Sequence, residues 1–245
     1  MSALSAAAGP TSAPGSSPGS SSPRGALILF EGIDRCGKST QVKLLSEYLK
    51  SKTACEDIRF PDRTSYIGKL INDYLANAAS TSGISDQTIH LLFSANRWEA
   101  SKAIEEKLLA GTTFVCDRYA YSGVSFSAAK GTAGMDLEWC KSCDRGLLAP
   151  DAIIYLDMPV EDAAKRGDFG QERYEKIDFQ LKVREQFMAL KAENDASGSS
   201  SSSSSRVPWH VVDAAQSIET IRDIIRGIAD KTVADVQDRP ISRLW

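Results

Sequence analysis

The stretch ALILFEGIDRCGKSTQ, residues 26–41, contains the signals for a strand, a glycine loop and a helix in that order. Residues 26–30 form an uninterrupted apolar run, which is typical of a strand buried on both faces. Residues 39–52 carry apolar side chains at helical spacing. Gly32 and Gly37 stand between the two, where glycine allows backbone conformations that other residues avoid. The stretch therefore predicts a strand that passes through a tight loop into a helix.

The loop matches the pattern G-x-x-x-x-G-K-[ST] from Gly32 to Ser39 without a mismatch. In such a phosphate-binding loop, backbone N–H groups point at phosphate oxygens and the following helix adds its positive N-terminal end. We expect Lys38 to reach the β- and γ-phosphates of a nucleoside triphosphate and Ser39 to offer its hydroxyl to Mg²⁺. The alternative is a glycine-rich turn that binds nothing, and the predicted strand and helix on either side argue against it.

A second ligand for Mg²⁺ is predicted at Asp117, which ends the apolar run TFVCD, residues 113–117. Taken alone, Asp117 is equally well read as a surface carboxylate after a strand, but its combination with the loop favours the metal. The chain lacks the N-K-x-D sequence with which GTPases read guanine. Motor and transporter ATPases are normally larger. A small kinase, which must also hold a phosphate acceptor, is the class that these observations favour.

Three arginines are suited to an anionic acceptor, because a guanidinium binds phosphate oxygens bidentately. Arg63 and Arg118 each follow a predicted strand, and the carboxyl ends of parallel strands share the rim on which ligands bind. Arg97 lies within a predicted helix. Each arginine alone is more commonly a solvated surface residue. Nearby aromatic side chains suit a stacked base, although core packing is the interpretation we prefer for the two tyrosines: Phe60, Phe93, Tyr119, Tyr121 and Phe126.

The rest of the chain alternates apolar runs with helical patterns, which predicts an α/β fold with a parallel sheet covered on both faces. We expect one three-layer domain with a five-stranded sheet, the fold of P-loop NTPases. The further strands are predicted at residues 55–60, 113–117, 152–157 and 209–214, and the further helices at 65–77, 85–111, 178–193 and 217–230, with a Ser or Asp cap before the second of these and Gly111 closing it.

Low-complexity segments mark the limits of this domain. Residues 1–23 are rich in Ser, Ala, Gly and Pro and are predicted to be a disordered tail, so that the domain spans 24–245. The serine run at 197–205 is predicted to be a flexible loop within it rather than a linker between domains. The charged, glycine-interrupted segment at about 163–175 is predicted to be a short lid whose arginines, Arg166 and Arg173, swing over phosphates and exclude water. An ordinary solvated turn is the alternative.

Composition excludes several other classes. The net charge of −3 gives no global basic field, so we expect no nucleic-acid partner. No run of about 18 apolar residues is present, so we expect no membrane association. The N-terminus carries neither a secretory h-region nor the arginines of a mitochondrial presequence, and the cysteine count is odd, 5. These features predict a cytoplasmic protein and leave a nuclear pool open. The lone pair Cys140 and Cys143 is interpreted as two half-buried helix cysteines rather than a metal site.

Several motifs, taken together, resemble the thymidylate kinase (dTMP kinase) family of nucleoside monophosphate kinases, in its eukaryotic type. They occur in the order of the family and span residues 24–245: FEGIDRCGKSTQ, RFPDRTS followed by IGKLI, HLLFSANRWE, DRYAYSGVSFSAAKG, AAKRGDFGQERYE and VVDAAQSIE. The resemblance implies transfer of the γ-phosphoryl group of ATP to dTMP, with Mg²⁺, in dTTP biosynthesis. It also implies a homodimer whose interface is formed by the long helices.

The resemblance also implies roles for particular residues. Asp34, Arg35, Lys38 and Arg118 would be catalytic, with Asp34 accepting from the sugar 3′-hydroxyl and Arg35 contacting the transferred phosphoryl group. Ser39 and Asp117 would hold the metal. ATP would be bound by Gly32, Arg35, Cys36, Gly37, Lys38, Ser39, Thr40 and Arg166, the last packing near adenine. Phe93 would stack on thymine, Arg97 would bond the base, Arg63 and Arg118 would bind the dTMP phosphate, and Tyr174 would lie near C2′, in a pocket completed by Asp34, Phe60, Ser122, Gly123, Phe126 and Gln180.

In one branch of the family the catalytic arginine lies in the phosphate loop, and Asp34-Arg35 indicates that branch. Cys36 departs from the small residue common in the family, and a thiol at a helix N-terminus tends towards reactivity. Two other functions were weighed. Another small P-loop kinase is disfavoured by Phe93, Arg97 and Tyr174, and a non-catalytic nucleotide sensor is disfavoured by the intact set of loop residues.

Overall fold

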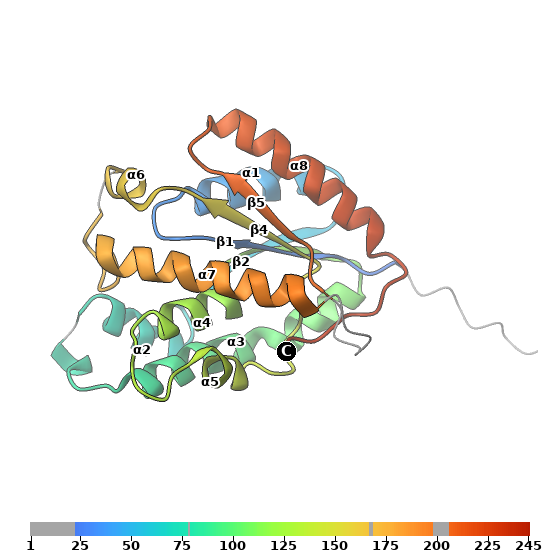
Figure 1. Ribbon diagram of the computed structural model, residues 1–245. Helices are drawn as coiled ribbons and strands as arrows, with labels where there is room; N and C mark the ends of the chain where they lie inside the picture. The colour runs from blue at the N-terminus through green and yellow to red at the C-terminus, as the bar shows by residue number, and fades with distance from the viewer. Residues whose placement is uncertain (1–22, 78, 167–168, 198–205) are drawn as a thin grey trace, which may run out of the picture.

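The computed structural model describes residues 23–77, 79–166, 169–197 and 206–245. Its centre is a five-stranded, wholly parallel sheet in the order β2-β3-β1-β4-β5, covered by helices on both faces (Figure 1). The predicted α/β fold and strand number are therefore confirmed. The strands are β1 (Leu27–Glu31), β2 (Cys55–Arg59), β3 (Thr113–Asp117), β4 (Ala152–Asp157) and β5 (Trp209–Asp213).

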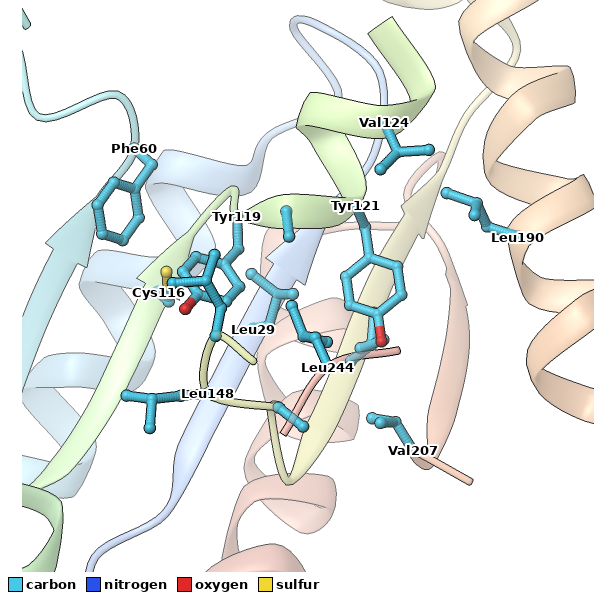
Figure 2. Close-up of a cluster of buried hydrophobic side chains, with 14 of the residues drawn as sticks. Leu29, Phe60, Cys116, Tyr119, Tyr121, Val124, Leu148, Leu190, Val207 and Leu244 are labelled. Atoms are coloured by element: carbon cyan, nitrogen blue, oxygen red, sulfur yellow. The ribbon is translucent and has the colours of Figure 1, made fainter. Parts of the chain in front are cut away.

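Alternate residues of β1 enter two separate cores, because side chains of a strand alternate between its faces. Ile28 and Phe30 pack in the core that contains α1 (Lys38–Lys50) and α8 (Ile218–Asp235). Leu27 and Leu29 pack on the other side, in a cluster to which Tyr119, Tyr121 and Val124 belong (Figure 2). Both tyrosines are 3% exposed, which confirms their interpretation as core residues. The sheet is thus the middle of three layers.

Serine caps begin three of the long helices. Ser65, Ser85 and Ser217 each accept a hydrogen bond from the backbone N–H three residues further on, which satisfies a donor that has no partner within the helix. The cap predicted at Ser85 is confirmed, and Gly111 follows the same helix with a φ of 94°. The helices concerned are α2 (Tyr66–Leu75), α3 (Asp86–Leu109) and α8. The predicted helix at 178–193 extends further, as α7 (Ile177–Ser197).

Two short helices and one 3₁₀ turn were not predicted: α4 (Ala120–Ala128), α6 (Val160–Ala164) and η1 (Ala79–Thr81). A third short helix, α5 (Leu137–Ser142), was expected only through the interpretation of Cys140 as a helix residue. The N-terminus of α4 shows why its sequence gives little sign of a helix. The cap is supplied from β1, where one carboxylate oxygen of Glu31 accepts from the backbone N–H groups of Tyr119 and Ser122, at 3.0 Å each. A cap from a distant strand leaves no local signature.

The remaining predictions about segments concern the ends and loops. The tail at 1–22 and residues 198–205 of the serine run lie outside the described residues. Among the residues that the structure describes, no helix is both long enough and apolar enough to cross a membrane.

Candidate active site

The candidate site lies where β1 and β3 end side by side. These two strands are paired in parallel, with Phe30 opposite Asp117, so the loops that follow them emerge together. The loop after β1 is the glycine loop. Asp117 is the last residue of β3, and Arg118 follows it. Two sequence motifs that stand about 80 residues apart are therefore neighbours only because of the sheet order.

Both glycines of the loop are required by its backbone. Gly32 has a φ of 143° and Gly37 a φ of 98°, in the region that favours glycine. A Cβ on Gly32 would also lie 2.6 Å from the carbonyl oxygen of Leu156, closer than packing allows. Lys38 is 5% exposed and donates to the carbonyl oxygens of Gly32 and Ile33, at 3.2 Å and 2.5 Å. The carbonyl groups of the loop thus fix the position of the Lys38 ammonium group beside the loop backbone.

Ser39 and Asp117 lie together, as the sequence predicts. The Ser39 hydroxyl donates to Asp117 Oδ2 at 2.8 Å, and Asp117 is 3% exposed. Its other oxygen, Oδ1, is buried without a hydrogen-bond partner within the described residues. A buried carboxylate oxygen left in this state suits a cation or its water shell. The described residues contain no group of three or more His, Cys, Asp or Glu that could hold a metal, so the pair fits an ion that is completed by phosphate oxygens and water.

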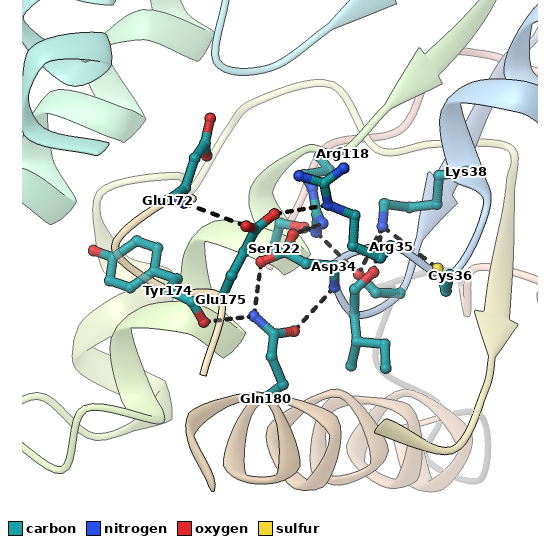
Figure 3. A network of polar contacts seen from close by, with 12 residues as sticks. Asp34, Arg35, Cys36, Lys38, Arg118, Ser122, Glu172, Tyr174, Glu175 and Gln180 are labelled. Carbon is teal, nitrogen blue, oxygen red and sulfur yellow. Dashed lines mark hydrogen bonds and ion pairs between the residues drawn. The ribbon is translucent and has the colours of Figure 1, made fainter. Parts of the chain in front are cut away.

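Asp34 of the glycine loop and Arg118 form a bridge between the two halves of the site, which are the glycine loop and the pocket that Arg118 lines (Figure 3). Arg118 donates to Asp34 Oδ1 and, at 2.9 Å, to the carbonyl oxygen of Gly32. Gln180 of α7 binds Asp34 twice, through the Asp34 carboxylate at 2.7 Å and its backbone N–H at 2.9 Å. Burial acts to lower the pKa of Arg118, but the carboxylates of Asp34, Asp117 and Glu31 outweigh it and raise that pKa. The guanidinium is thus a fixed cation.

A pocket of about 100 Å³ opens beside this bridge. Its lining combines charged groups with rings, and Arg118 lies over the Phe126 ring at 5.2 Å from its centroid. Arg97 lines it while being only 2% exposed, because its guanidinium is paired with Asp144. The predicted acceptor residues that line the pocket are Asp34, Phe60, Arg63, Phe93, Arg97, Arg118, Ser122, Gly123, Phe126 and Tyr174, and Gln180 touches it through Asp34 and the backbone of Tyr174.

A turn at residues 169–176, called the lid turn below because it overlaps the predicted lid at about 163–175, contacts both the glycine loop and the pocket. Glu175 accepts from Arg35 Nε at 2.8 Å, and Glu172 pairs with Arg63 at the same distance. Arg166 donates to the carbonyl oxygens of Arg35 and Ala214, so it reaches the phosphate loop as expected. Arg173 does not. It lies over the Tyr74 ring at 4.0 Å and donates to the Tyr74 carbonyl, away from the glycine loop. The expectation that Arg173 swings over phosphates stays a prediction, and it would require Arg173 to leave the Tyr74 ring.

Cys36 was expected to be reactive, but its thiol is buried. Cys36 is 1% exposed, and its sulfur lies 3.5 Å from Lys38 Nζ, so a reagent reaches the thiol only if the loop opens. Cys140 lies in α5 and is fully buried, whereas Cys143 follows the helix with its sulfur 3.2 Å from a ring nitrogen of His90.

Thr40, predicted to contact ATP, is exposed at the start of α1.

Three functional carboxylates were missed by the sequence analysis: Glu31, Asp144 and Glu175. Each acts on a residue that the analysis had singled out, Glu31 on Ser122, Asp144 on Arg97 and Glu175 on Arg35. The partners are 47 to 140 residues apart in the chain. Glu31 directly precedes the glycine loop, which was the one available signal. The other two have no local pattern.

Comparison with known proteins agrees with this geometry. The family model described as thymidylate kinase matches residues 30–225. The chain is 45% identical to thymidylate kinase of Arabidopsis thaliana over 225 residues, which cover 91% of this chain and 78% of that protein. It is 43% identical to the Homo sapiens thymidylate kinase, covering 91% and 98% of the two chains.

A solved structure of thymidylate kinase from Candida albicans superimposes with a TM-score of 0.76 at 34% identity, covering 91% of this chain and all of that one. Fold and sequence therefore agree over most of the length. This chain belongs to the thymidylate kinase family.

Proposed function

We propose the residue roles through which this chain performs the reaction of its family, the transfer of the γ-phosphoryl group from ATP to dTMP. The observation that carries the proposal is the bridge formed by Asp34 and Arg118. Arg118 touches the glycine loop through the Gly32 carbonyl and also lines the aromatic pocket. A donor phosphate in the loop and an acceptor phosphate beside Arg118 would thus face each other across one guanidinium.

The glycine loop would bind the phosphates of ATP. Its backbone N–H groups and the N-terminus of α1 supply positive potential without side-chain movement. Lys38 would exchange its loop carbonyl partners for phosphate oxygens, and Arg35 would neutralise charge on the transferred group. Cys36, Gly37 and Thr40 would contribute backbone contacts. Arg166, which rests on the Arg35 and Ala214 carbonyls, is placed beside the end of the loop where a nucleoside would extend.

The pocket would bind dTMP. Arg63 and Arg118 supply a cationic end for its phosphate, while Phe93 and Arg97 supply a ring face and a hydrogen-bond donor for the base. Asp34, held by Arg118 and Gln180, would accept from the sugar 3′-hydroxyl. Tyr174, packed against Phe126 and Phe179, would narrow the space beside C2′. The acceptor is already an oxyanion, so positioning and charge neutralisation suffice and no strong base is required.

Ser39 and Asp117 would hold Mg²⁺. When bound, the ion supplies charge neutralisation to the β- and γ-phosphate oxygens. The unpartnered Oδ1 of Asp117 supports this assignment. An Asp117→Asn substitution should therefore raise the Mg²⁺ concentration needed for half-maximal ATP binding, as measured by calorimetry. An unchanged requirement would reject the assignment.

A homodimer through the long helices is also proposed. Large apolar side chains are exposed on two neighbouring helices, Tyr66 and Leu70 on α2 and Leu91 and Trp98 on α3. Exposed apolar residues gathered on adjacent helices are typical of subunit interfaces. Light scattering on the purified chain should give twice the monomer mass, and Leu91→Glu should shift it towards the monomer. A monomeric unmodified chain would reject the proposal.

Residues 24–245 are proposed to form the functional unit, in the cytoplasm. All five cysteines fall within the described residues and are free, which is consistent with a reducing compartment. Fractionation of cells that express a tagged chain would test the compartment.

The deciding experiment is a coupled assay of ADP release with ATP and, separately, dTMP, dUMP, AMP or CMP. We expect turnover with dTMP to be fastest. Preference for another monophosphate would support a different small kinase, and ATP binding without turnover would support a nucleotide sensor. In the same assay Arg97→Ala should raise the KM for dTMP far more than that for ATP, and equal changes would mean that the acceptor residues are misassigned.

A further inference from the structure

Arg97 is an unusual pocket residue because its cation is almost wholly buried. It is 2% exposed and lies on α3, with its guanidinium packed against the backbone of Gly123 in α4, where an added Cβ would come within 2.9 Å of two of its nitrogens. A buried guanidinium is unstable unless its charge is paired and its N–H groups are bonded. The partner that meets this need is Asp144.

Asp144 is fully buried and lies in the turn after α5. Its Oδ1 accepts from Arg97 Nε at 3.2 Å and its Oδ2 from Arg97 Nη2 at 2.6 Å. The hydroxyl of Ser94, one helical turn before Arg97, lies 2.7 Å from Asp144 Oδ1 and 3.0 Å from the Cys143 carbonyl oxygen, and its single proton is shared between these two acceptors. The carboxylate is thus locked from three directions. It is not among the described residues that line the pocket, whereas Arg97 is.

The pairing selects which edge of the guanidinium meets a ligand. Asp144 takes the edge formed by Nε and Nη2, and within the described residues no hydrogen bond runs from Nη1. Because the guanidinium is planar and rigid, fixing two of its nitrogens fixes the direction of the third. Nη1, with both of its N–H groups outside this pair, is therefore the main donor that remains for a pyrimidine carbonyl in the pocket, beside the second N–H of Nη2.

We propose that Asp144 is a positioning residue for base recognition, which holds the Arg97 fork so that Nη1 faces the acceptor base. This inference rests on the proposed function, since it assigns Asp144 a part in dTMP binding through Arg97. Asp144 does not line the pocket, so it would act on dTMP only through Arg97. Its effect should fall on dTMP affinity and leave the ATP side, which lies across the Asp34–Arg118 bridge, unaffected.

The test is Asp144→Asn, which preserves shape but replaces one accepting oxygen by an amide NH₂ that cannot accept from the guanidinium. We expect the KM for dTMP and its calorimetric Kd to rise roughly 10-fold or more, as for loss of a hydrogen bond to a charged group. The KM for ATP should not change. An unchanged dTMP affinity, or equal losses for both substrates, would overturn the inference.

A matched control is Asp151→Asn. Asp151 is also little exposed and is paired with an arginine, Arg24, at 2.6 Å. It directly precedes β4, so it lies at the amino ends of the strands, whereas the site lies at their carboxyl ends. It should lower stability without changing the dTMP affinity. A double-mutant cycle adds a readout that a purely structural role would not give. In an Arg97→Met background, Asp144→Asn should weaken dTMP binding no further, and a full additional loss would overturn the inference.

Two further outcomes are kept distinct. If Asp144→Asn does not fold, Ser94→Ala decides, because it removes one of the bonds that hold the carboxylate. A smaller rise in the Kd for dTMP alone would support the inference, and no rise would overturn it. If the unmodified chain binds but does not phosphorylate dTMP, the proposed function fails, while the calorimetric comparison still tests Asp144.

Discussion

Glu175 ties Arg35, the proposed catalytic arginine, to the turn at residues 169–176. One carboxylate oxygen accepts from Arg35 Nε at 2.8 Å, and the other accepts from the backbone N–H groups of Gly170, Gln171 and Glu172, at 2.9, 2.9 and 3.2 Å (Figure 3). The same side chain therefore folds the lid turn and fixes a cation of the phosphate loop. Arg35 has a φ of 62°, a backbone conformation that surrounding contacts must maintain.

Replacing Glu175 by Gln should lower kcat by about 10- to 100-fold, because a displaced cation no longer lines up with the transferred phosphoryl group. A Gln has only one accepting oxygen and cannot serve both sets of donors. Glu172→Gln is the matched control on the same turn. Its pair with Arg63 is more than a third exposed on both sides, so its loss should change kcat little. Equal effects of the two substitutions in steady-state assays would contradict this assignment.

The contribution of Glu175 to stability should depend on pH in a defined direction. Burial acts to raise the pKa of Glu175, but the bonds from Arg35 and from the lid backbone outweigh it and lower that pKa below 4.5. A carboxylate with a lowered pKa stabilises the fold above its unfolded value, and the stabilisation is lost as pH falls through the folded value.

Urea unfolding of the unmodified chain and of Glu175→Gln should therefore differ by about 1–3 kcal/mol near neutral pH. The difference should stay constant down to the ordinary pKa of Glu, 4.5, and shrink below it. Comparing the two chains cancels the contribution of Glu31, whose pKa burial raises. A difference that grows towards acid pH would contradict the sign.

Lys38→Ala should abolish measurable phosphoryl transfer, with a loss of at least about 10²- to 10³-fold in kcat, because a cation aimed at the developing charge is removed. The fold should persist, since the hydrogen bonds of Lys38 within the described residues go to carbonyls of its own loop and to Cys36. Circular dichroism checks folding, and Lys43→Ala, at an exposed position of the same helix, is the control. Appreciable turnover by Lys38→Ala would place the catalytic cation elsewhere.

Gly123→Ala should raise the KM for dTMP about 10-fold or more, because even a small displacement of a positioned group is costly. The new Cβ would lie 2.8 Å from Arg97 Nη2, and Asp144 prevents the guanidinium from moving aside. Gly227→Ala is the control: that glycine lies in α8 with no atom within 4 Å of an added Cβ. It should stabilise the fold by about 0.5–1 kcal/mol and leave both KM values unchanged. An unaltered dTMP KM in Gly123→Ala would show that Arg97 has room to move.

Removal of residues 1–23 should leave kcat and both KM values unchanged, since the site motifs begin after this segment. Removal of residues 1–24 should also lower the melting temperature by several degrees. Arg24 is paired with Asp151 at 2.6 Å and bonds to the carbonyl oxygen of Arg239, so it fastens the start of β1 to the C-terminal part of the chain. Thermal melts of the two truncations would separate these effects. A large loss of turnover in the chain that lacks residues 1–23 would show that the tail has a function.

Long elements with their own signals were predicted well from the sequence. The five strands agree with the prediction to within a residue at each end. Four of them are largely apolar runs, whereas β2, CEDIR, carries charged side chains and gives a weaker signal. The caps of α2, α3 and α8 are likewise local. By contrast, the N-terminus of α4 depends on Glu31 of another strand, and Arg173 lies over the ring of Tyr74 of α2, which is 99 residues away in the chain. Contacts of this kind follow from packing and have no sequence period.

The sequence by itself determined the chemistry available to this protein: a glycine loop with its lysine and serine, an acid at the end of β3, and arginines and rings after strands and within α3. Backbone conformation and hydrophobic periodicity are local properties, so they can be read along the chain. The tertiary structure alone decided which carboxylate holds which arginine, Asp34 with Arg118, Glu175 with Arg35, and Asp144 with Arg97. Such pairs form only when the sheet order and the helix packing bring distant segments together and remove them from water, where an unpaired charge becomes costly.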